Sequence, residues 1–545
     1  MRTYRLPLLI LLCFAAVIRV GGIPAAHAQS SIPYLSGFPQ TRLGGVDFGS
    51  PTVVDIDGDG SLDILVPDND SCVWGYHADG TLLPNFPLMA FGDCYKRPRI
   101  NSPIAVGNVD DDPEPEIAAG TRGVSDLPGE LGKVFVWNPD GTLVDGWPQE
   151  MIWEPEKNDS FPEVYTVILA DVAGTSALEI IAGTSNNASD GGDPKVDNPL
   201  NLLVWDGSGT MLPGFPVGHR TPGIYGHLGA ANLIGDDYAE IIVPRDQPRM
   251  SVYDATAFEI PGWPSRSYVV EDETDFSTDP YVVFTRGAPA IADLNRDGIP
   301  EIAVAGRVKE PLLSYETTTN GLLVWEPDGN RAPGWDTAQR SGLLQTKNFA
   351  SNNGIAIADL DQDGMLDIIA NFFDGTIRAY AHDATPMWTF NFSQGRNLMA
   401  SEPVIGDITG DGQLNVVFGV YSPDYQHNEA GGVYALDAAG NLLPDFPLQL
   451  THEGSSSKQG IRAAPTLTDL DGDCTLEIAA ASWAGSLYVW DLDVPYIESR
   501  LPWPTGRQNI RRDGQMPIMK PASGEYRLFL PILMGTGCIP VEYAP

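Results

Sequence analysis

An acidic stretch from Asp55 to Asp63, Asp-Ile-Asp-Gly-Asp-Gly-Ser-Leu-Asp, has the residue types and the spacing to bind a cation. Carboxylates stand at its first, third, fifth and ninth positions, which are Asp55, Asp57, Asp59 and Asp63. The carbonyl of Ser61 can add one more oxygen. Ca²⁺ takes roughly 6–8 oxygen ligands, and a tight loop of alternating acids supplies most of them. Because four carboxylates this close repel one another, the stretch predicts a calcium loop.

The residues around this loop predict two β-strands rather than the two helices of an EF-hand. An EF-hand loop ends in a glutamate at its twelfth position, where this chain has Val66. Both flanks, 52–54 and 62–66, are rich in β-branched and apolar residues. Gly58 and Gly60 allow a sharp turn between them. We therefore expect a calcium loop inside a β-hairpin, and the alternative is an acidic turn without metal.

The acidic loop recurs eight times along the chain. Its copies begin at Asp55, Asn108, Asp171, Asn232, Asp293, Asp359, Asp407 and Asp469. Each belongs to a longer cassette with an apolar strand, a strand that carries an aromatic residue such as Trp137, and a proline-aromatic segment such as 145–148. Four strands per cassette, repeated around a ring, are typical of a β-propeller. We expect an all-β propeller of four-stranded blades, with eight blades favoured over seven and the third-strand aromatics in the core.

The oxygen donors in each loop decide which copies should hold metal. Five firm sites are predicted, from Asp55, Asp57, Asp59, Ser61 and Asp63; Asn108, Asp110, Asp112 and Glu116; Asp293, Asn295, Asp297 and Glu301; Asp359, Asp361, Asp363 and Asp367; and Asp469, Asp471, Asp473 and Glu477. A sixth site with less charge, and therefore weaker, is formed by Asp407, Thr409, Asp411 and Asn415. The two remaining loops have Ala173 and Ile234 at the third position, which cannot coordinate, so we expect metal-free turns there. Calcium should act structurally, because its binding free energy becomes folding free energy.

Length and charge limit the possible classes of protein. The chain has 545 residues, more than one compact core of ordinary size needs, and its formal net charge is -40 with a pI near 4.3. So acidic a protein should repel nucleic acid and anionic membranes. We therefore expect neither as a partner.

The N-terminal residues 1–28 read as a signal peptide. A short basic region with Arg2 and Arg5 precedes an apolar run from Leu6 to Ile18, and small residues around Ala28 provide a cleavage point. The alternative is a retained anchor. No later stretch is apolar enough to span a membrane, so the protein is expected to be secreted or at the cell surface.

The four cysteines that remain after the signal peptide permit disulfides in an exported protein. Cys72 with Cys94 is one plausible pair, and Cys474 with Cys538 is the other. Free buried thiols are the alternative for each pair.

The two ends of the expected ring, residues 48–514, are harder to assign. Residues 29–47 contain Ser36-Gly37-Phe38-Pro39, which resembles a fourth segment and could close the ring beside the final blade. However, Leu501-Pro502-Trp503-Pro504 already reads as the fourth segment of the last cassette. Residues 515–545 form an apolar tail broken by prolines, and it either docks on the propeller or acts in surface retention.

The cassettes resemble the FG-GAP/VCBS repeats, whose propeller is shared with the integrin α-subunit head. The resemblance rests on Phe48-Gly49-Ser50-Pro51 before the first loop, Gly287-Ala288-Pro289 before the fifth, and the Asp-x-Asp-x-Asp-Gly loops themselves. It covers roughly residues 48–514 and implies a calcium-binding propeller. It does not specify a function, because such propellers serve as adhesins, receptors and accessory modules of enzymes.

The sequence contains no His-Glu-x-x-His pair, no Gly-x-Ser-x-Gly elbow and no phosphate-binding loop, so it offers no catalytic motif of these kinds.

The main hypothesis is a non-enzymatic, monomeric binding or adhesion module for an extracellular protein or glycan. One alternative is a rhamnogalacturonan-type polysaccharide lyase, because some pectin-cleaving lyases resemble eight-bladed calcium-loop propellers. Its candidate residues are His219, Arg220, His227, Arg245 and Arg249. The second alternative is a structural cell-surface spacer. Basic and aromatic residues clustered at one end of the central channel would favour the lyase, and a continuous acidic surface would favour the adhesin or the spacer.

Overall fold

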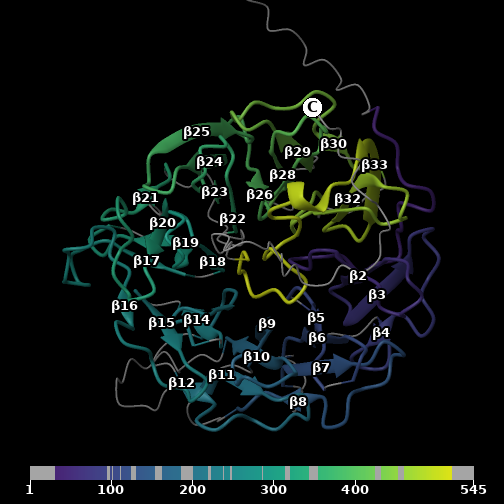
Figure 1. Cartoon of the computed structure of the whole chain (residues 1–545), viewed down its shortest axis with the longest axis horizontal. Helices are drawn as coiled ribbons and strands as arrows, with labels where there is room; N and C mark the ends of the chain where they lie inside the picture. The colour runs from purple at the N-terminus through teal and green to yellow at the C-terminus, as the bar shows by residue number, and fades with distance from the viewer. Residues whose placement is uncertain are drawn as a thin grey trace, which may run out of the picture.

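The computed structural model is a closed ring of eight β-sheets around a central axis (Figure 1). It describes residues 31–94, 99–100, 102–110, 112–123, 131–153, 162–185, 200–218, 223–236, 238–245, 248–284, 286–313, 319–342, 354–423, 431–451 and 459–517. Within these residues the one helical element is a short 3-10 helix, η1 (Glu498–Arg500). The prediction of an all-β propeller with eight blades is confirmed.

The first four blades each contain four antiparallel strands in chain order, and the first strand of each lies nearest the axis (Figure 1). Blade one has β1 (Thr52–Val54), β2 (Asp63–Pro67), β3 (Cys72–His77) and β4 (Leu88–Met89). Blade two has β5 (Ala105–Gly107), β6 (Glu116–Gly120), β7 (Lys133–Trp137) and β8 (Gln149–Glu150). Blade three has β9 (Val164–Ala170), β10 (Glu179–Thr184), β11 (Leu200–Trp205) and β12 (Val217–Gly218). Blade four has β13 (Gly229–Ala231), β14 (Glu240–Pro244), β15 (Arg249–Tyr253) and β16 (Ser265–Arg266).

Blades five and seven divide the innermost position between two short strands. Blade five has β17 (Tyr281–Val283) and β18 (Ala290–Ala292), both paired with β19 (Glu301–Lys309), then β20 (Thr319–Trp325) and β21 (Gln339–Arg340). Blade six has β22 (Ile355–Ala358), β23 (Asp367–Phe372), β24 (Thr376–Tyr380) and β25 (Pro386–Asn391). Blade seven has β26 (Met399–Ala400) and β27 (Val404–Gly406), both paired with β28 (Asn415–Tyr421), then β29 (Gly432–Leu436) and β30 (Leu448–Gln449).

Blade eight is completed by residues from both ends of the chain. Its own strands are β31 (Thr466–Thr468), β32 (Thr475–Ala481) and β33 (Leu487–Pro495). The outer edge of β33 is paired with the N-terminal segment, where Tyr34 bridges Trp490 and Gln40 bridges Leu487. The N-terminal segment therefore forms the outer edge of the last blade, which joins the two ends of the chain and closes the ring.

The interpretation of Leu501–Pro504 as the last fourth segment is wrong. The N-terminal residues already occupy the edge of β33, so the chain after η1 turns into the ring and runs through its centre (Figure 1). Trp503 bridges Ile405 on β27, and Gln515 bridges Ile291 on β18. We call residues 501–516 the channel segment. Residues 518–545, which include most of the predicted tail, lie outside the described part of the chain.

Adjacent blades are joined by their aromatic residues and by close backbone contacts. The third-strand aromatics are buried, which confirms their assignment to the core; they are Trp137, Trp205, Tyr253, Trp325, Tyr380 and Trp490. Trp263 of blade four donates from Nε1 to the carbonyl of Pro327 in blade five at 2.7 Å. Gly262 lies so close to the next blade that an added Cβ would stand 1.7 Å from the Asp328 carbonyl oxygen. Gly37 makes the same kind of contact with Asp79 of blade one, as expected for an outer strand of blade eight.

The predicted disulfide between Cys72 and Cys94 is present. Cys474 is also disulfide-bonded, whereas its predicted partner Cys538 lies outside the described residues. In the described part of the chain, no helix is long and apolar enough to cross a membrane. The predicted signal peptide, residues 1–28, is outside the described part.

Candidate metal centres

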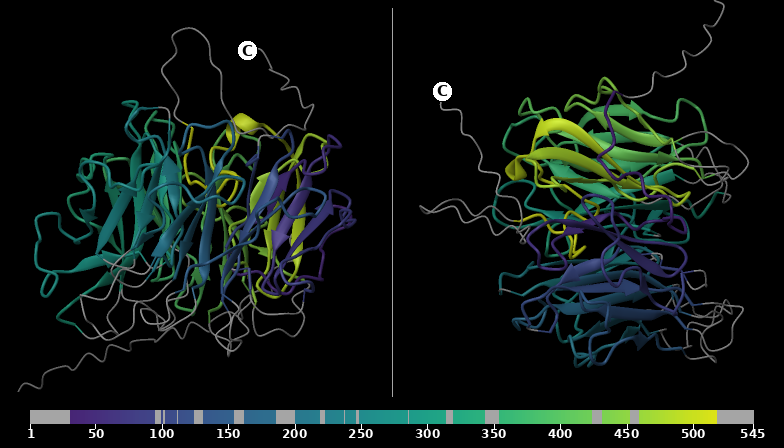
Figure 2. Two further views of the ribbon diagram at one scale, coloured as in Figure 1. Left: turned by 90° about the horizontal axis from the view of Figure 1, so that it is seen from below. Right: turned by 90° about the vertical axis from the view of Figure 1, so that its right-hand side faces the viewer.

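The eight acidic loops all connect the innermost strand of a blade to its second strand, so they share one end of the ring. Figure 2 shows in side view that the strands run between two ends of the ring, with η1 at one of them. In every loop the backbone N–H at position two donates to the side chain at position nine. The distance is 2.7 Å from Val109 to Glu116, and 2.8 Å from Val172 to Glu179 in a loop that was predicted to lack metal. Position nine therefore fixes the hairpin in every blade, a role that the sequence did not reveal.

Acidic side chains converge in four of the five loops that were predicted as firm sites. In each group the ligand atoms lie within 4.8 Å of one another; the groups are Asp55, Asp57 and Asp59; Asp110, Asp112 and Glu116; Asp359, Asp361 and Asp367; and Asp469, Asp471, Asp473 and Glu477. The last group combines four carboxylates, two of them buried. Such groups offer only oxygen ligands, which suit a hard cation such as Ca²⁺.

Unpartnered buried oxygens test whether the loops fit a cation. Glu116 Oε1, Asp359 Oδ1 and Glu477 Oε1 are buried and have no hydrogen-bond partner among the described residues. Burial and the neighbouring aspartates raise the pKa of Glu116 to about 7 and that of Glu477 to about 9. A buried carboxylate without a hydrogen-bond partner needs a proton or a bound cation to be stable. The residues therefore fit calcium, which would neutralise the loop acids and tie the two strands of each hairpin together.

The first loop has an additional side chain that the sequence did not single out. His77 on β3 lies opposite Asp63 in the strand register, and its Nδ1 is 3.0 Å from Asp63 Oδ1. Burial raises the pKa of Asp63 to about 6. The exposed Ser61 donates its backbone N–H to Asp59 Oδ1 at 2.7 Å. If Asp63 is a calcium ligand, His77 would share its carboxylate with the bound cation.

The fifth loop satisfies its buried glutamate by a different route. Asn295 Nδ2 donates to Glu301 Oε1 at 3.0 Å, and Asp293 accepts backbone N–H groups of Asp297 and Gly298, both at 2.9 Å. Burial raises the pKa of Glu301 to about 8. Because an amide already bonds the oxygen that is bare in Glu116 and Glu477, calcium binding here would require Asn295 to turn its oxygen inward.

An arginine partly neutralises the seventh loop, which was predicted to bind weakly. Arg500 Nη1 of η1 lies 2.9 Å from Asp407 Oδ2. Thr409 and Asn415 carry no charge, so only Asp411 remains as a second acid. A cation at this loop competes with the guanidinium for Asp407, which is a physical reason for low affinity.

The two loops that were predicted to lack metal satisfy their acids with protein donors. Glu179 Oε2 accepts from the backbone N–H groups of Val172 and Ala173, and Glu179 Oε1 accepts from Thr175 Oγ1 at 3.2 Å. In the other loop, Asn232 Oδ1 accepts from the N–H of Gly235 at 2.6 Å. Glu240 Oε2 of that loop accepts from the N–H of Leu233 at 2.7 Å, so both hairpins have protein donors for their ninth-position acid.

The raised pKa values predict a pH dependence of the metal-free protein. Glu116 and Glu477 titrate near 7 and 9 when folded, against an ordinary value of 4.5, so the folded chain retains protons that the unfolded chain releases. This contribution to stability is fully present below pH 4.5 and is lost as the pH rises through the folded values. In chelator, the melting temperature should fall between pH 5 and pH 8, and calcium should reduce the fall. Scanning fluorimetry at both pH values checks this. An equal fall in melting temperature with and without calcium would contradict it.

The residues proposed for a lyase do not converge. His219 and Arg220 lie outside the described residues. Arg245 bonds Glu259 at 2.9 Å, and Arg249 is on the third strand of its blade, away from the axis. The side chain of His227 is buried, and burial together with nearby arginines lowers its pKa to about 3. The described members of the set therefore form no common site.

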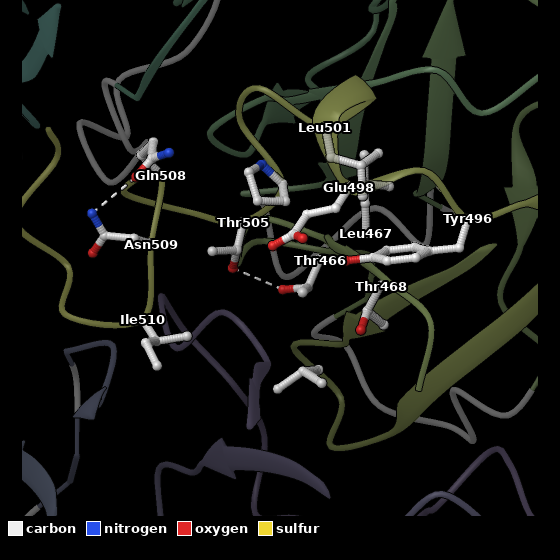
Figure 3. Close-up of a pocket in the computed structure, with 12 residues that line it drawn as sticks. Thr466, Leu467, Thr468, Tyr496, Glu498, Leu501, Thr505, Gln508, Asn509 and Ile510 are labelled. Atoms are coloured by element: carbon white, nitrogen blue, oxygen red, sulfur yellow. Dashed lines mark hydrogen bonds between the residues drawn. The ribbon is translucent and has the colours of Figure 1, made fainter. Parts of the chain in front are cut away.

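A small pocket of about 70 Å³ lies between the channel segment and blade eight (Figure 3). Its lining includes Thr466, Tyr496, Glu498 and Thr505. Thr466 Oγ1 is 2.9 Å from Thr505 Oγ1, and burial raises the pKa of Glu498. Burial and the acids Glu498, Asp469 and Glu477 also raise the pKa of Tyr496. The sequence did not point to this pocket, because Leu501–Pro504 was assigned to an outer strand and the residues after it were not placed in the ring.

Comparison with known proteins adds a repeat family and a set of structural relatives. A model of the FG-GAP-like repeat matches residues 359–418, which contain the sixth and seventh loops. No curated protein matches the chain. The match covers one repeat, so it supports a propeller repeat protein without extending to the whole chain.

The similar solved structures include other propellers. Sqt1 of Saccharomyces cerevisiae has a TM-score of 0.51 and 10% identity, with 86% of this chain and 100% of that chain covered. The C-terminal WD40 domain of Sif2 has a TM-score of 0.45 and 13% identity, with 84% and 99% covered. The rhamnogalacturonan lyase YesW has a TM-score of 0.30 and 14% identity, with 88% and 97% covered. At these identities the likeness to Sqt1 shows the fold alone.

Proposed function

We propose that this chain is an exported, calcium-stabilised propeller that acts as a non-enzymatic binding module for an extracellular protein or glycan. The observation that carries the calcium role is the set of converging carboxylates with buried, unpartnered oxygens in Glu116, Asp359 and Glu477. Extracellular calcium modules bind at about 10⁻⁴–10⁻³ M, where loops of this composition are expected to be occupied outside cells. Export is supported by the signal-like residues 1–28.

The filled channel supports a binding role over catalysis in the interior. Backbone N–H groups of the innermost strands in six blades donate to carbonyls of the channel segment; the donors are Val106, Leu169, Ala230, Ile291, Ile405 and Leu467. A substrate therefore has no open passage along the axis. The ends of the ring remain as the surfaces that can present side chains to a partner.

One observation favours the lyase as a second candidate. Arg286 and Arg462 pack on Phe48 at the end of the channel opposite the metal loops, which is the kind of basic and aromatic cluster that such an enzyme would use. Against it, the described lyase candidates from the sequence do not converge on a base. A lyase needs both a base and a cation that stabilises the sugar carboxylate.

A binding screen combined with an activity assay tests the proposed function. The full chain is applied to glycan and protein arrays in calcium and in chelator, and is incubated with pectin and rhamnogalacturonan while ultraviolet absorbance is followed. We expect calcium-dependent binding to one class of ligand and no unsaturated product. Product formation would overturn the non-enzymatic role, and binding that is unchanged in chelator would overturn the calcium role.

A further inference from the structure

Three arginines gather on the ring axis at the end opposite the metal loops. Arg286 and Arg462 both lie over the ring of Phe48, with guanidinium carbons 4.6 and 4.2 Å from its centroid. Phe48 precedes β1 of blade one, and Arg286 precedes β18 of blade five, so their contact joins opposite blades of the ring. Residues from opposite blades can meet only near the axis. We call Asp47, Phe48, Arg122, Glu163, Tyr165, Arg286 and Arg462 the axial arginine cluster.

Two of these arginines are already neutralised by acids. Arg462 Nη1 lies 2.8 Å from Asp47 Oδ1, and both side chains are at least nine-tenths buried. Arg122 Nη2 donates to both oxygens of Glu163, at 2.8 and 2.6 Å, and its guanidinium lies 5.8 Å from the centroid of Tyr165. Each of these two ion pairs is therefore electrically neutral as a whole.

Arg286 differs from both, because it forms no ion pair or hydrogen bond of its own among the described residues, and the nearby Asp47 is paired with Arg462. Its Nη1 atom is buried and unpartnered, although the residue as a whole is half-buried. Its φ of 60° is in the left-handed region, which is costly for a residue other than glycine. Burial and the charge of Arg462 lower the pKa of Arg286 to about 10, so it remains charged at neutral pH. Burial of the Nη1 group without an acceptor costs free energy, which a bound anion would offset.

The channel segment closes the cluster from the inside. Arg507 Nη2 donates to the carbonyl of Leu228 at 2.9 Å, and the backbone N–H of Arg507 donates to Glu402 Oε1 at 2.6 Å. Arg512 Nε donates to the carbonyl of Ile104 at 3.1 Å. Most of the polar groups of these two arginines are therefore bonded within the protein, although Arg507 Nε is buried without a partner. Arg122, with 30% of its side chain exposed, and the half-buried Arg286 are the cations that solvent can reach.

We propose that the axial arginine cluster binds one carboxylate group of a ligand, with Arg286 as its main partner. Three arginines against Asp47 and Glu163 leave an excess of one positive charge, which a monoanion balances. A guanidinium presents paired N–H groups that match the two oxygens of a carboxylate. Phosphate, as a dianion, would overcompensate this charge, and the net charge of -40 repels multiply charged anions. The inference rests on the proposed binding function and adds its site and ligand chemistry.

Calorimetric titration of the full chain in calcium tests the inference. The probes are two matched pairs, glucuronate with glucose and N-acetylglycine with its amide, together with inorganic phosphate. We expect the acid of at least one pair to bind and its neutral partner and phosphate not to bind. Binding of only one acid identifies the source of the carboxylate as a sugar or a peptide.

Variants locate the binding. Arg286→Gln should weaken the binding of the acid about 10-fold or more, as expected for loss of a charge-assisted hydrogen bond, and Arg286→Lys should weaken it less. Arg331→Gln is the matched control, because Arg331 is a buried guanidinium of the same blade that lies 4.7 Å from the centroid of Trp325, away from the axis. It should leave the affinity unchanged.

Distinct outcomes separate this inference from the proposed function. The inference is overturned if no acid binds, if a neutral partner binds equally well, or if Arg286→Gln and Arg331→Gln have equal effects. If a ligand from the array screen binds the Arg286→Gln variant with full affinity, the proposed binding function is supported, but the axial arginine cluster is not its binding site. If the acid binds but chelator does not change the melting temperature, the carboxylate site is supported and the structural role of calcium is contradicted.

Discussion

Removal of calcium is expected to lower the melting temperature of this protein by about 10 °C. At about 10 mM calcium, a site with a dissociation constant of about 10⁻⁴–10⁻³ M contributes about 1.4–2.7 kcal/mol to folding. Five such sites together contribute about 7–13 kcal/mol. A chain of this length has an unfolding entropy of about 1 kcal/mol/K, so the loss converts to a shift of about 10 °C.

Calorimetry in calcium, in chelator and in magnesium measures this effect. The matched variants are Glu477→Gln and Glu179→Gln, which change position nine in a loop expected to hold calcium and in one expected to lack it. Both acids accept the cross-loop bond from position two, but only Glu477 has a bare buried oxygen, while Thr175 satisfies Glu179. Only Glu477→Gln should reduce the number of calcium ions bound, by one. A melting temperature that chelator leaves unchanged would refute the structural role of the metal.

Replacement of Arg512 by leucine should destabilise the fold by about 3–5 kcal/mol, the effect of breaking a buried charge network. The guanidinium of Arg512 is fully buried and bonds Ile104 O at 3.1 Å, Thr52 Oγ1 at 2.6 Å and Ser50 O at 3.3 Å. It also bonds Thr505 Oγ1 of its own segment. The side chain thus ties the channel segment to blades one and two, and its loss leaves several buried acceptors unsatisfied.

The neighbouring Arg511 provides the control for this variant. Its side chain is 34% exposed and makes an ion pair with the buried Asp513 at 3.0 Å. Because Asp513 also accepts hydrogen bonds from Asn509 Nδ2 and the backbone N–H of Gln515, Arg511→Leu should cost less than Arg512→Leu. Equilibrium unfolding curves in guanidinium chloride compare the two variants. Equal midpoints would show that the channel segment adds little to the stability of the ring.

Much of the fold could be predicted because it follows from local and repeated patterns. The loop from Asp55 to Asp63 has its acids and glycines within nine residues, and its flanking strands alternate in the same short window. Eight copies then indicate eight blades, and a buried aromatic such as Trp325 follows from its place in the cassette. The acids that converge in four of the loops could be named for the same reason, since their spacing alone brings them together.

Contacts that reach beyond one acidic loop could not be predicted in this way. His77 meets Asp63 through the pairing register of two strands, and Arg500 meets Asp407 across 93 residues. The residues of the channel segment lack the cassette pattern, and their partners lie in blades that the sequence separates widely. No local spacing encodes such contacts, so Leu501–Pro504 was wrongly assigned to an outer strand and the rest of the segment was given no place in the ring.

The amino-acid sequence by itself determined the repeated hairpin and its acidic loop, because these depend on neighbours within one cassette, and it favoured eight blades over seven. Only the tertiary structure decided what occupies the axis. Closure of the ring brings Phe48 and Arg286 into contact, although 238 residues separate them (286 − 48), and it surrounds Arg512 with carbonyls from two blades. Burial near the axis then determines which charges find a partner within the protein and which, like that of Arg286, do not.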